Sequence, residues 1–428
     1  MTFASLIVTA AATATLFDAE TATRAYLATL NGAARVRSDH YFEGGYWLGL
    51  WGTLVAVASY WLMLRRGWSA WWSGWASRVT SRRWLQPALY SLPFGIVGAL
   101  LTLPWTIYAS FLRERQYGLM NQDFPAWAGE QGIALLVGLV TTAIFFTVIF
   151  ALIRRAPRSW WAWAGGATAL MLALMVMVAP VFIAPLFNKY TPMAEGPMRD
   201  NILGMAHREG IPANNVYVFD ASKQTKRISA NVSGLGPTIR ISLNDNLLKR
   251  SSPEGVMAVM GHEMGHYKLG HIAKFLLYLT LIIFGLMFLS SWATPRLLAR
   301  YGERWGVRDA SDPAVAPLFS IIISLVLLLL TPLLNTMVRV SESEADAFGL
   351  EAARQPDGFA MTAMQLSEYR KLEPSTLEEA LFFDHPSGRT RVRMAMEWKA
   401  KHLNELPLEQ RGMMVMTSPP SPPPRPTK

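Results

Sequence analysis

The 428-residue chain has no cysteine, and only 16% of its residues are charged. The lack of cysteine excludes disulfide bonds and a thiol nucleophile. Average soluble domains carry about 25% charged residues, so this chain has few charges for a soluble protein. The charges are also clustered. Six stretches contain no Asp, Glu, Lys or Arg: residues 44–64, 84–112, 131–153, 159–188, 275–295 and 313–338.

Each of these six stretches is long enough to cross a membrane, since ~20 residues span a ~30 Å hydrocarbon core. A soluble protein with apolar core helices would rarely contain six of this length. Residues 1–17 are uncharged as well, and they indicate either a short seventh span or a signal peptide. The lack of a basic segment before them favours a retained span. Tryptophans at the ends of several stretches are typical of a membrane interface: Trp68, Trp71, Trp72, Trp75, Trp84, Trp160, Trp161 and Trp163.

The net charge of +10 would also suit a nucleic-acid-binding protein, but the positions of the arginines argue against that class. Twelve of them lie in three short regions between apolar stretches: Arg65, Arg66, Arg78, Arg82, Arg83, Arg154, Arg155, Arg158, Arg296, Arg300, Arg304 and Arg308. Arginine-rich loops of this kind determine the orientation of membrane proteins. We therefore expect the lipid bilayer, and no nucleic acid, among the partners of this chain.

The most informative motif is His262-Glu263-Met264-Gly265-His266. Residues four apart on a helix share one face, so both imidazoles can reach one Zn²⁺ at roughly 2.0–2.1 Å. Glu263 lies about 100° further round the helix, where it can contact a metal-activated water without binding the metal. The motif therefore predicts a zinc hydrolase, with His262 and His266 as ligands and Glu263 as the general base.

The alternation of apolar and polar sequence predicts five segments. They are N-terminal transmembrane helices (1–188), a zinc protease lobe with an edge strand and the zinc-motif helix (189–273), two further spans (274–338), a C-terminal helical part (339–405) and a disordered Pro-rich tail (406–428).

The first polar segment has a mixed α/β pattern. It predicts a helix near 198–209, a strand at 215–219, a hairpin that pairs 228–232 with 238–243, and a helix near 246–250. The helix with the zinc motif is expected to begin at Ser252-Pro253-Glu254, because serine and proline are typical at helix N-termini.

A catalytic zinc needs a third protein ligand and an open position. His271 follows His266 by five residues, and on a continuing helix it would point elsewhere. Glu342 and Asp346 are four apart and share a helix face, so that one can bind zinc while the other accepts a proton from a ligating imidazole. By composition alone, these residues are better described as a solvated acidic helix end.

Over roughly residues 40–395 the chain resembles the Ste24-type CAAX prenyl proteases, integral-membrane zinc metallopeptidases of peptidase family M48. The resemblance rests on the segment Val259 to His271, on Glu342-Ser343-Glu344-Ala345-Asp346, on Ala184 to Pro192, and on His385-Pro386-Ser387 with Arg391 six residues after the histidine. The segment Ser229 to Gly236 is similar to the family's substrate-side edge strand.

The resemblance implies a role for each of these motifs. It implies Glu342 as the third zinc ligand and Asp346 as the carboxylate behind a ligating histidine. It implies that His385 and Arg391 face the active site and substrate, with His385 stabilising the oxyanion. Asn231 would lie on an exposed edge strand that binds an extended peptide by strand addition.

The implied fold is mostly α, with six to seven transmembrane helices and a small mixed α/β, gluzincin-like zinc metalloprotease domain. The expected function is that of a membrane zinc metalloendopeptidase with one Zn²⁺ per chain, which hydrolyses membrane-associated or lipid-tethered peptides and proteins. The alternatives are a bacterial membrane-protein quality-control protease of the same family and, in a different class, a catalytically silent scaffold or transporter with a structural zinc.

Two arguments predict different sides of the membrane for the active site. By alternation of the spans, the arginine-rich loops lie opposite the zinc lobe, so the positive-inside rule places the lobe outside the cytoplasm. The family's eukaryotic members imply a cytosolic site instead. In a bacterium the chain would lie in the inner membrane.

Overall fold

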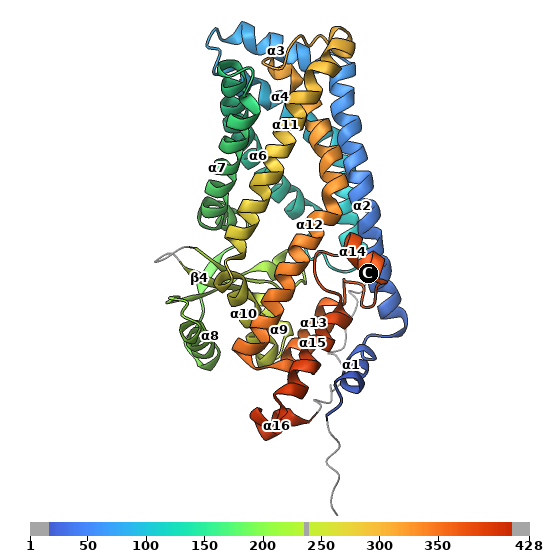
Figure 1. Cartoon of the computed structure of the whole chain (residues 1–428), viewed down its shortest axis with the longest axis vertical. Helices are drawn as coiled ribbons and strands as arrows, with labels where there is room; N and C mark the ends of the chain where they lie inside the picture. The colour runs from blue at the N-terminus through green and yellow to red at the C-terminus, as the bar shows by residue number, and fades with distance from the viewer. Residues whose placement is uncertain (1–16, 235–238, 413–428) are drawn as a thin grey trace, which may run out of the picture.

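The computed structural model describes residues 17–234 and 239–412. The molecule is elongated, with a bundle of long helices at one end and a mixed α/β domain at the other (Figure 1). Residues 1–16, which belong to the predicted short first span, lie outside the described residues.

Six helices in the described part of the chain are long and apolar enough to cross a membrane, as the charge-free stretches predict. They are α2 (Gly32–Arg65), α4 (Gln86–Ile107), α6 (Phe124–Arg155), α7 (Trp160–Val178), α11 (His271–Trp305) and α12 (Ala316–Ala353). Two of these continue through π-helical turns: α4 through Tyr108–Leu112 into α5 (Arg113–Gln116), and α7 through Ala179–Ile183 into a 3-10 turn at Ala184–Leu186.

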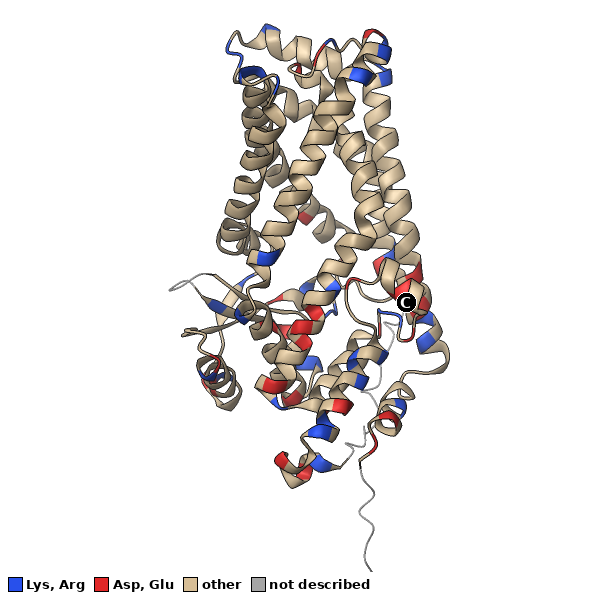
Figure 2. Cartoon of the chain, in the orientation of Figure 1, with Lys and Arg blue, Asp and Glu red and all other residues tan. Residues whose placement is uncertain are grey.

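The end of the bundle far from the α/β domain carries α3 (Trp68–Val79) and clusters of arginine (Figure 2). Buried aromatic side chains pack the bundle near this end, among them Tyr90, Phe94 and Phe150. The one buried phenol hydroxyl of this group, on Tyr90, lies 2.6 Å from the Ser69 hydroxyl. This hydrogen bond satisfies the Tyr90 hydroxyl, which is buried away from solvent.

The α/β domain contains a four-stranded sheet in the order β1-β2-β4-β3. Its strands are β1 (Tyr190–Pro192), β2 (Val216–Phe219), β3 (Ala230–Ser233) and β4 (Arg240–Asn244). The predicted hairpin is present as the antiparallel β3–β4 pair, and the predicted strand at 215–219 is β2. Because β3 pairs only with β4, it is an edge strand of the described sheet.

Two helices cover this sheet: α8 (Pro197–Arg208) and α10 (Pro253–Lys268). The alternating residues Ile241 and Leu243 of β4 are fully buried against Met205 of α8 and Met260 of α10. Helix α10 begins as predicted, because the Ser252 side chain accepts a hydrogen bond from the Gly255 backbone N–H at 3.2 Å.

The remaining helices surround the far side of α10. They are α1 (Ala19–Leu27), α9 (Asp245–Arg250), α13 (Pro356–Leu366), α14 (Thr376–Phe382), α15 (Gly388–Lys401) and α16 (Leu408–Arg411). A buried carboxylate joins three of them: Asp357 accepts from the Tyr26 hydroxyl at 2.7 Å and from the Lys399 ammonium at 2.5 Å.

Helix α12 runs unbroken through position 339, so the last span and the start of the C-terminal part form one helix. The structure differs from the predicted tail at its start. Residues 406–412 were expected to begin a disordered tail, yet Leu406 is buried and Leu408–Arg411 forms a helical turn. Residues 413–428 lie outside the described residues.

Candidate metal centre and active site

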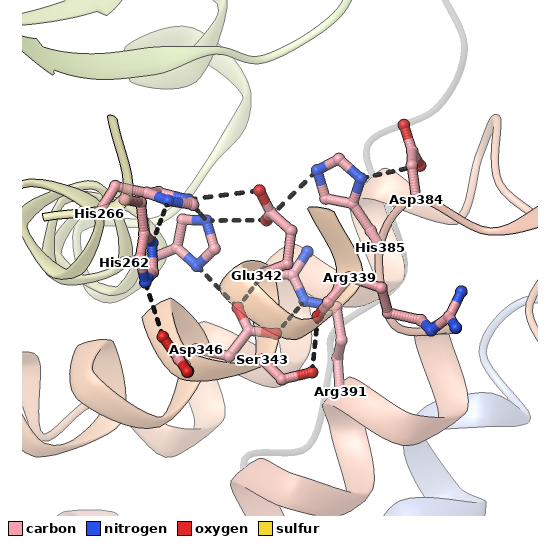
Figure 3. A network of polar contacts seen from close by, with 11 residues as sticks. His262, His266, Arg339, Glu342, Ser343, Asp346, Asp384, His385 and Arg391 are labelled. Atoms are coloured by element: carbon pink, nitrogen blue, oxygen red, sulfur yellow. Dashed lines mark hydrogen bonds and ion pairs between the residues drawn. The ribbon is translucent and has the colours of Figure 1, made fainter. Parts of the chain in front are cut away.

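Three side chains from two helices converge on one point (Figure 3). His262 and His266 of α10 place their Nε2 atoms 3.1 Å apart. The Glu342 carboxylate of α12 lies 3.2 Å from His262 Nε2 and 3.4 Å from His266 Nε2. Within the described residues, no other group of three His, Cys, Asp or Glu side chains could hold a metal ion.

The spacing of these donor atoms fits a tetrahedral zinc site. Ligands about 2.0–2.1 Å from a tetrahedral centre are about 3.3–3.4 Å from one another. The three observed separations, 3.1, 3.2 and 3.4 Å, lie close to this value. Two imidazoles and one carboxylate are also the donor set of catalytic zinc sites that keep a fourth position open.

Small residues allow α12 to bring Glu342 so close to α10. Gly261 and Gly265 of α10 face Ala345 and Gly349 of α12. A Cβ added at Gly349 would lie 2.7 Å from the backbone nitrogen of His262, a distance that real Cβ atoms essentially never show. Pairs of small residues four apart let two helix backbones approach closely. The sequence signal for this pairing is Gly-x-x-x-Gly in α10 and Ala-x-x-x-Gly in α12.

A buried ion pair lies behind His262. Its Nδ1 is 2.7 Å from Asp346, which is fully buried and also accepts two hydrogen bonds from Arg391, at 2.9 and 2.6 Å. An ionised Asp346 accepts a hydrogen bond from the Nδ1–H group and leaves the Nε2 lone pair free to bind metal. The Arg391 guanidinium thus binds Asp346, and Arg391 also lines the pocket that contains Glu263 and His385. A contact between Arg391 and substrate stays a prediction.

A second hydrogen-bonded chain lies behind His266. Its Nδ1 is 2.9 Å from His271 Nδ1, and His271 Nε2 is 2.9 Å from Glu344, which Lys274 contacts at 2.7 Å. The helix does not continue through His271 as we expected, because α10 ends at Lys268. Gly270 adopts a left-handed conformation at φ 66°, and α11 begins at His271, so the chain turns back toward His266. The sequence signal for this was the glycine directly before His271.

Glu263 and His385 both line the pocket at the metal site. Glu263 lines the same pocket as His262, and burial raises the pKa of the Glu263 carboxyl. His385 Nε2 lies 3.3 Å from Glu342, and its Nδ1 is 2.9 Å from Asp384. Burial lowers the pKa of the His385 imidazole, and the Asp384 carboxylate opposes this by stabilising the imidazolium.

The site opens into a pocket of about 160 Å³ beside the edge strand. The residues that line it from this strand and the segment before it are Ile228, Ser229 and Ala230. Asn231 follows on the same strand, opposite Ser242 of β4. The expected strand therefore lies beside the metal site. The pocket is lined by its first residue, Ala230, and by the two residues before it, whereas Asn231 is not among the lining residues.

Comparison with known proteins identifies the family. Residues 192–399 match the model of peptidase family M48, and residues 28–189 match the model described as CAAX prenyl protease N-terminal, five membrane helices. In this chain the second range contains α2, α4, α6 and α7 of the six membrane-length helices, together with the shorter α3.

Individual relatives agree with these matches. The uncharacterized metalloprotease YhfN of Bacillus subtilis is 26% identical, over 75% of this chain and 76% of that protein. CAAX prenyl protease 1 of Saccharomyces cerevisiae is 26% identical, over 69% of each chain. The crystal structure of Ste24p from S. mikatae has the same fold, with a TM-score of 0.70, 18% identity and coverage of 88% of this chain and 96% of that one.

The fold and the matched families define an integral membrane metallopeptidase with several spans. The chain belongs to peptidase family M48 and carries the N-terminal membrane region of the CAAX prenyl proteases. This identification favours the peptidase over the silent scaffold or transporter that the sequence left open.

Proposed function

We propose that this protein is a zinc endopeptidase that cleaves membrane-associated or lipid-tethered polypeptides, in the manner of its relatives named CAAX prenyl protease 1. The observation that carries the proposal is the near-tetrahedral spacing of the His262, His266 and Glu342 donor atoms beside the Glu263 carboxylate.

In this proposal each side chain near the metal site has its own role in hydrolysis. Bound zinc would polarise the scissile carbonyl and acidify the attacking water. Glu263 accepts the proton of that water and later delivers it to the leaving amine. A pKa raised by burial suits this exchange, because a base near the operating pH can both take up and release a proton. Asp346 and Arg391 hold His262 in the tautomer that the metal needs.

We assign the stabilisation of the oxyanion to His385. Asp384 stabilises the imidazolium form of His385, and in that form Nε2 carries a proton that it can donate to the developing negative charge. The substrate would lie along the exposed edge of β3, where Ser229 and Ala230 line the pocket and Asn231 adds a side-chain contact.

His385→Ala is expected to lower kcat by about 10²–10³-fold with little change in KM, because an oxyanion donor acts mainly in the transition state. Asn231→Ala is the matched comparison. It should mainly raise KM, since it removes a contact to the bound substrate. Steady-state kinetics on purified protein in detergent measures both. An unchanged kcat in His385→Ala would remove the histidine from the reaction.

The proposal treats residues 189–273 and 339–405 as two parts of one protease domain, with 1–188 and 274–338 as the membrane region. Helices α11 and α12 connect the two parts of the domain through the bundle. A cavity of about 1700 Å³ extends from the α/β domain between α2 and α12. Its apolar lining includes Trp47, Leu327 and Leu328, which suits substrates that arrive from the bilayer.

Metal analysis tests the zinc assignment directly. Purified protein should contain one zinc per chain and cleave a reporter peptide. Removal of the metal by a chelator should abolish cleavage, and added Zn²⁺ should restore it. Circular dichroism of the metal-free protein shows whether the fold persists, so that loss of activity is not confused with unfolding. Cleavage by protein shown to be free of metal would contradict the proposal.

We propose further that the protease domain lies on the face of the membrane opposite the cytoplasm. The twelve arginines of the short loops belong to the end of the bundle that carries α3, far from the α/β domain (Figure 2). Such loops favour the cytoplasmic side. A tag after Lys428 should then be reachable by protease in intact cells or, if an outer membrane is present, in spheroplasts. A tag that is protected in spheroplasts would reverse the orientation.

A further inference from the structure

Arg370 lies in the loop between α13 and α14, and this loop is held firmly. The residues on either side of the Arg370–Lys371 pair, Tyr369 and Leu372, are buried. From α2, the Ser38 hydroxyl lies 2.6 Å from the backbone carbonyl oxygen of Ser367 and 3.1 Å from that of Arg370. The Arg370 side chain therefore projects from a fixed backbone.

Within residues 17–234 and 239–412, the Arg370 guanidinium has neither an ion-pair nor a hydrogen-bond partner. Burial and the nearby Arg391 lower its pKa. The other arginines near the site are all engaged. Arg391 binds Asp346, Arg227 lies 2.7 Å from Glu114, and Arg339 donates to two backbone carbonyls. Asp384 and Glu342 attract the Arg370 guanidinium, but neither pairs with it directly. A half-buried cation without a direct partner is unfavourable, so an anion from outside the chain would stabilise it.

The position of Arg370 indicates where such an anion would come from. Arg370 lines the pocket beside Glu263, Glu342 and His385, and it also lines the large cavity between α2 and α12. A peptide that extends from the metal site into this cavity must pass it. Among the described residues, the lining of this cavity has one acidic side chain, Asp384, and its carboxylate is already hydrogen-bonded to His385.

We propose that Arg370 binds a carboxylate of the peptide substrate, either the C-terminal carboxylate or an acidic side chain, on the cavity side of the scissile bond. The inference rests on the proposed peptidase function. Arginine suits this role because its planar guanidinium can donate two parallel hydrogen bonds to one carboxylate. The enzyme would then select substrates by the position of a negative charge relative to the bond that it cleaves.

Two pairs of matched peptides distinguish the sources of the carboxylate. One pair differs only in a free or amidated C-terminus, and the other, with amidated ends, differs only in Glu or Gln on the leaving side. Wild-type kcat/KM should favour the charged member of one pair by about 10- to 100-fold, the range of a hydrogen bond to a charged group. Arg370→Gln should abolish that preference. Arg370→Lys should retain part of it.

Arg393→Gln is the control, because Arg393 is exposed on α15 and pairs only with Glu397. It should keep the full preference. Zinc content and the circular dichroism spectrum, compared with wild type, show whether Arg370→Gln is folded. The inference is overturned if wild type shows no preference in either pair, or if Arg370→Gln keeps the same preference.

A binding measurement separates this inference from the proposed peptidase function. Fluorescent versions of the four peptides can be titrated into Glu263→Gln protein with and without Arg370→Gln, and this requires no catalysis. If wild-type protein cleaves none of the peptides, the peptidase function fails. Tighter binding of a charged peptide that depends on Arg370 still supports the inference, and equal binding of all four overturns it.

Discussion

Glu263→Gln is expected to keep its zinc and to lose peptidase activity by roughly two to four powers of ten, the contribution of a positioned general acid–base. The amide has nearly the shape of the carboxylate, so the pocket that Glu263 shares with His262, Glu342 and His385 should keep its form. What the amide lacks is the ability to accept a proton from water and to return it to the leaving amine. Zinc content and kcat, measured on the same preparation, separate the two effects.

Two companion variants sharpen this result. Glu263→Asp keeps a carboxylate but withdraws it by one methylene, and it should fall between wild type and Glu263→Gln. Glu397→Gln makes the same chemical change on the exposed face of α15 and should leave the rate unchanged. A Glu263→Gln enzyme with near wild-type kcat would mean that another group moves the proton.

Glu342→Ala is expected to lose both zinc and activity. Without this carboxylate, two imidazoles remain, and a catalytic zinc held by two protein ligands is not stable in competition with a chelator. The loss of affinity should exceed the 10–100-fold that follows from removing a contact behind a ligand. Glu342 also lies 3.3 Å from His385 Nε2, so its removal disturbs the far side of the pocket too. Zinc per chain after gel filtration, together with reporter cleavage, measures the effect.

Neighbouring residues of α12 supply the controls for this experiment. Asp346→Asn should weaken zinc binding by about 10–100-fold, because it supports His262 but does not bind metal itself. Ser343→Ala removes a hydroxyl that bonds only to the carbonyl of Arg339 in its own helix, and it should bind zinc normally. Full zinc occupancy in Glu342→Ala would exclude this residue from the metal site and require another third ligand.

The parts of the fold that could be predicted from the sequence are those governed by local pattern. Six charge-free stretches correspond to the six membrane-length helices, because the bilayer selects apolar length directly. The hairpin of β3 and β4 followed from alternating residues on either side of a glycine-rich turn. The start of α10 at Ser252 followed from capping chemistry alone.

The roles of single side chains followed less well from pattern. Arg391 belongs to a family motif, yet the sequence could not say whether its guanidinium would meet substrate or Asp346, 45 residues away in the chain. His271 was assigned to a continuing helix, but the left-handed turn at Gly270 brings it to His266. Arg370 carried no sequence signal, because a lack of partners becomes visible only when every neighbouring charge has been placed.

The sequence by itself determined that this is a membrane protein with a His-Glu-x-x-His helix, because hydrophobic length and helical periodicity act within a single segment. Only the tertiary structure decided which carboxylate meets that helix and which charges remain free around it. Glu342 stands 76 residues after His266, beyond a helix that turns back through the bundle. It arrives beside the imidazoles because glycines on α10 and α12 let the two backbones touch. Such a contact is a matter of surface shape between distant segments, which no local pattern specifies.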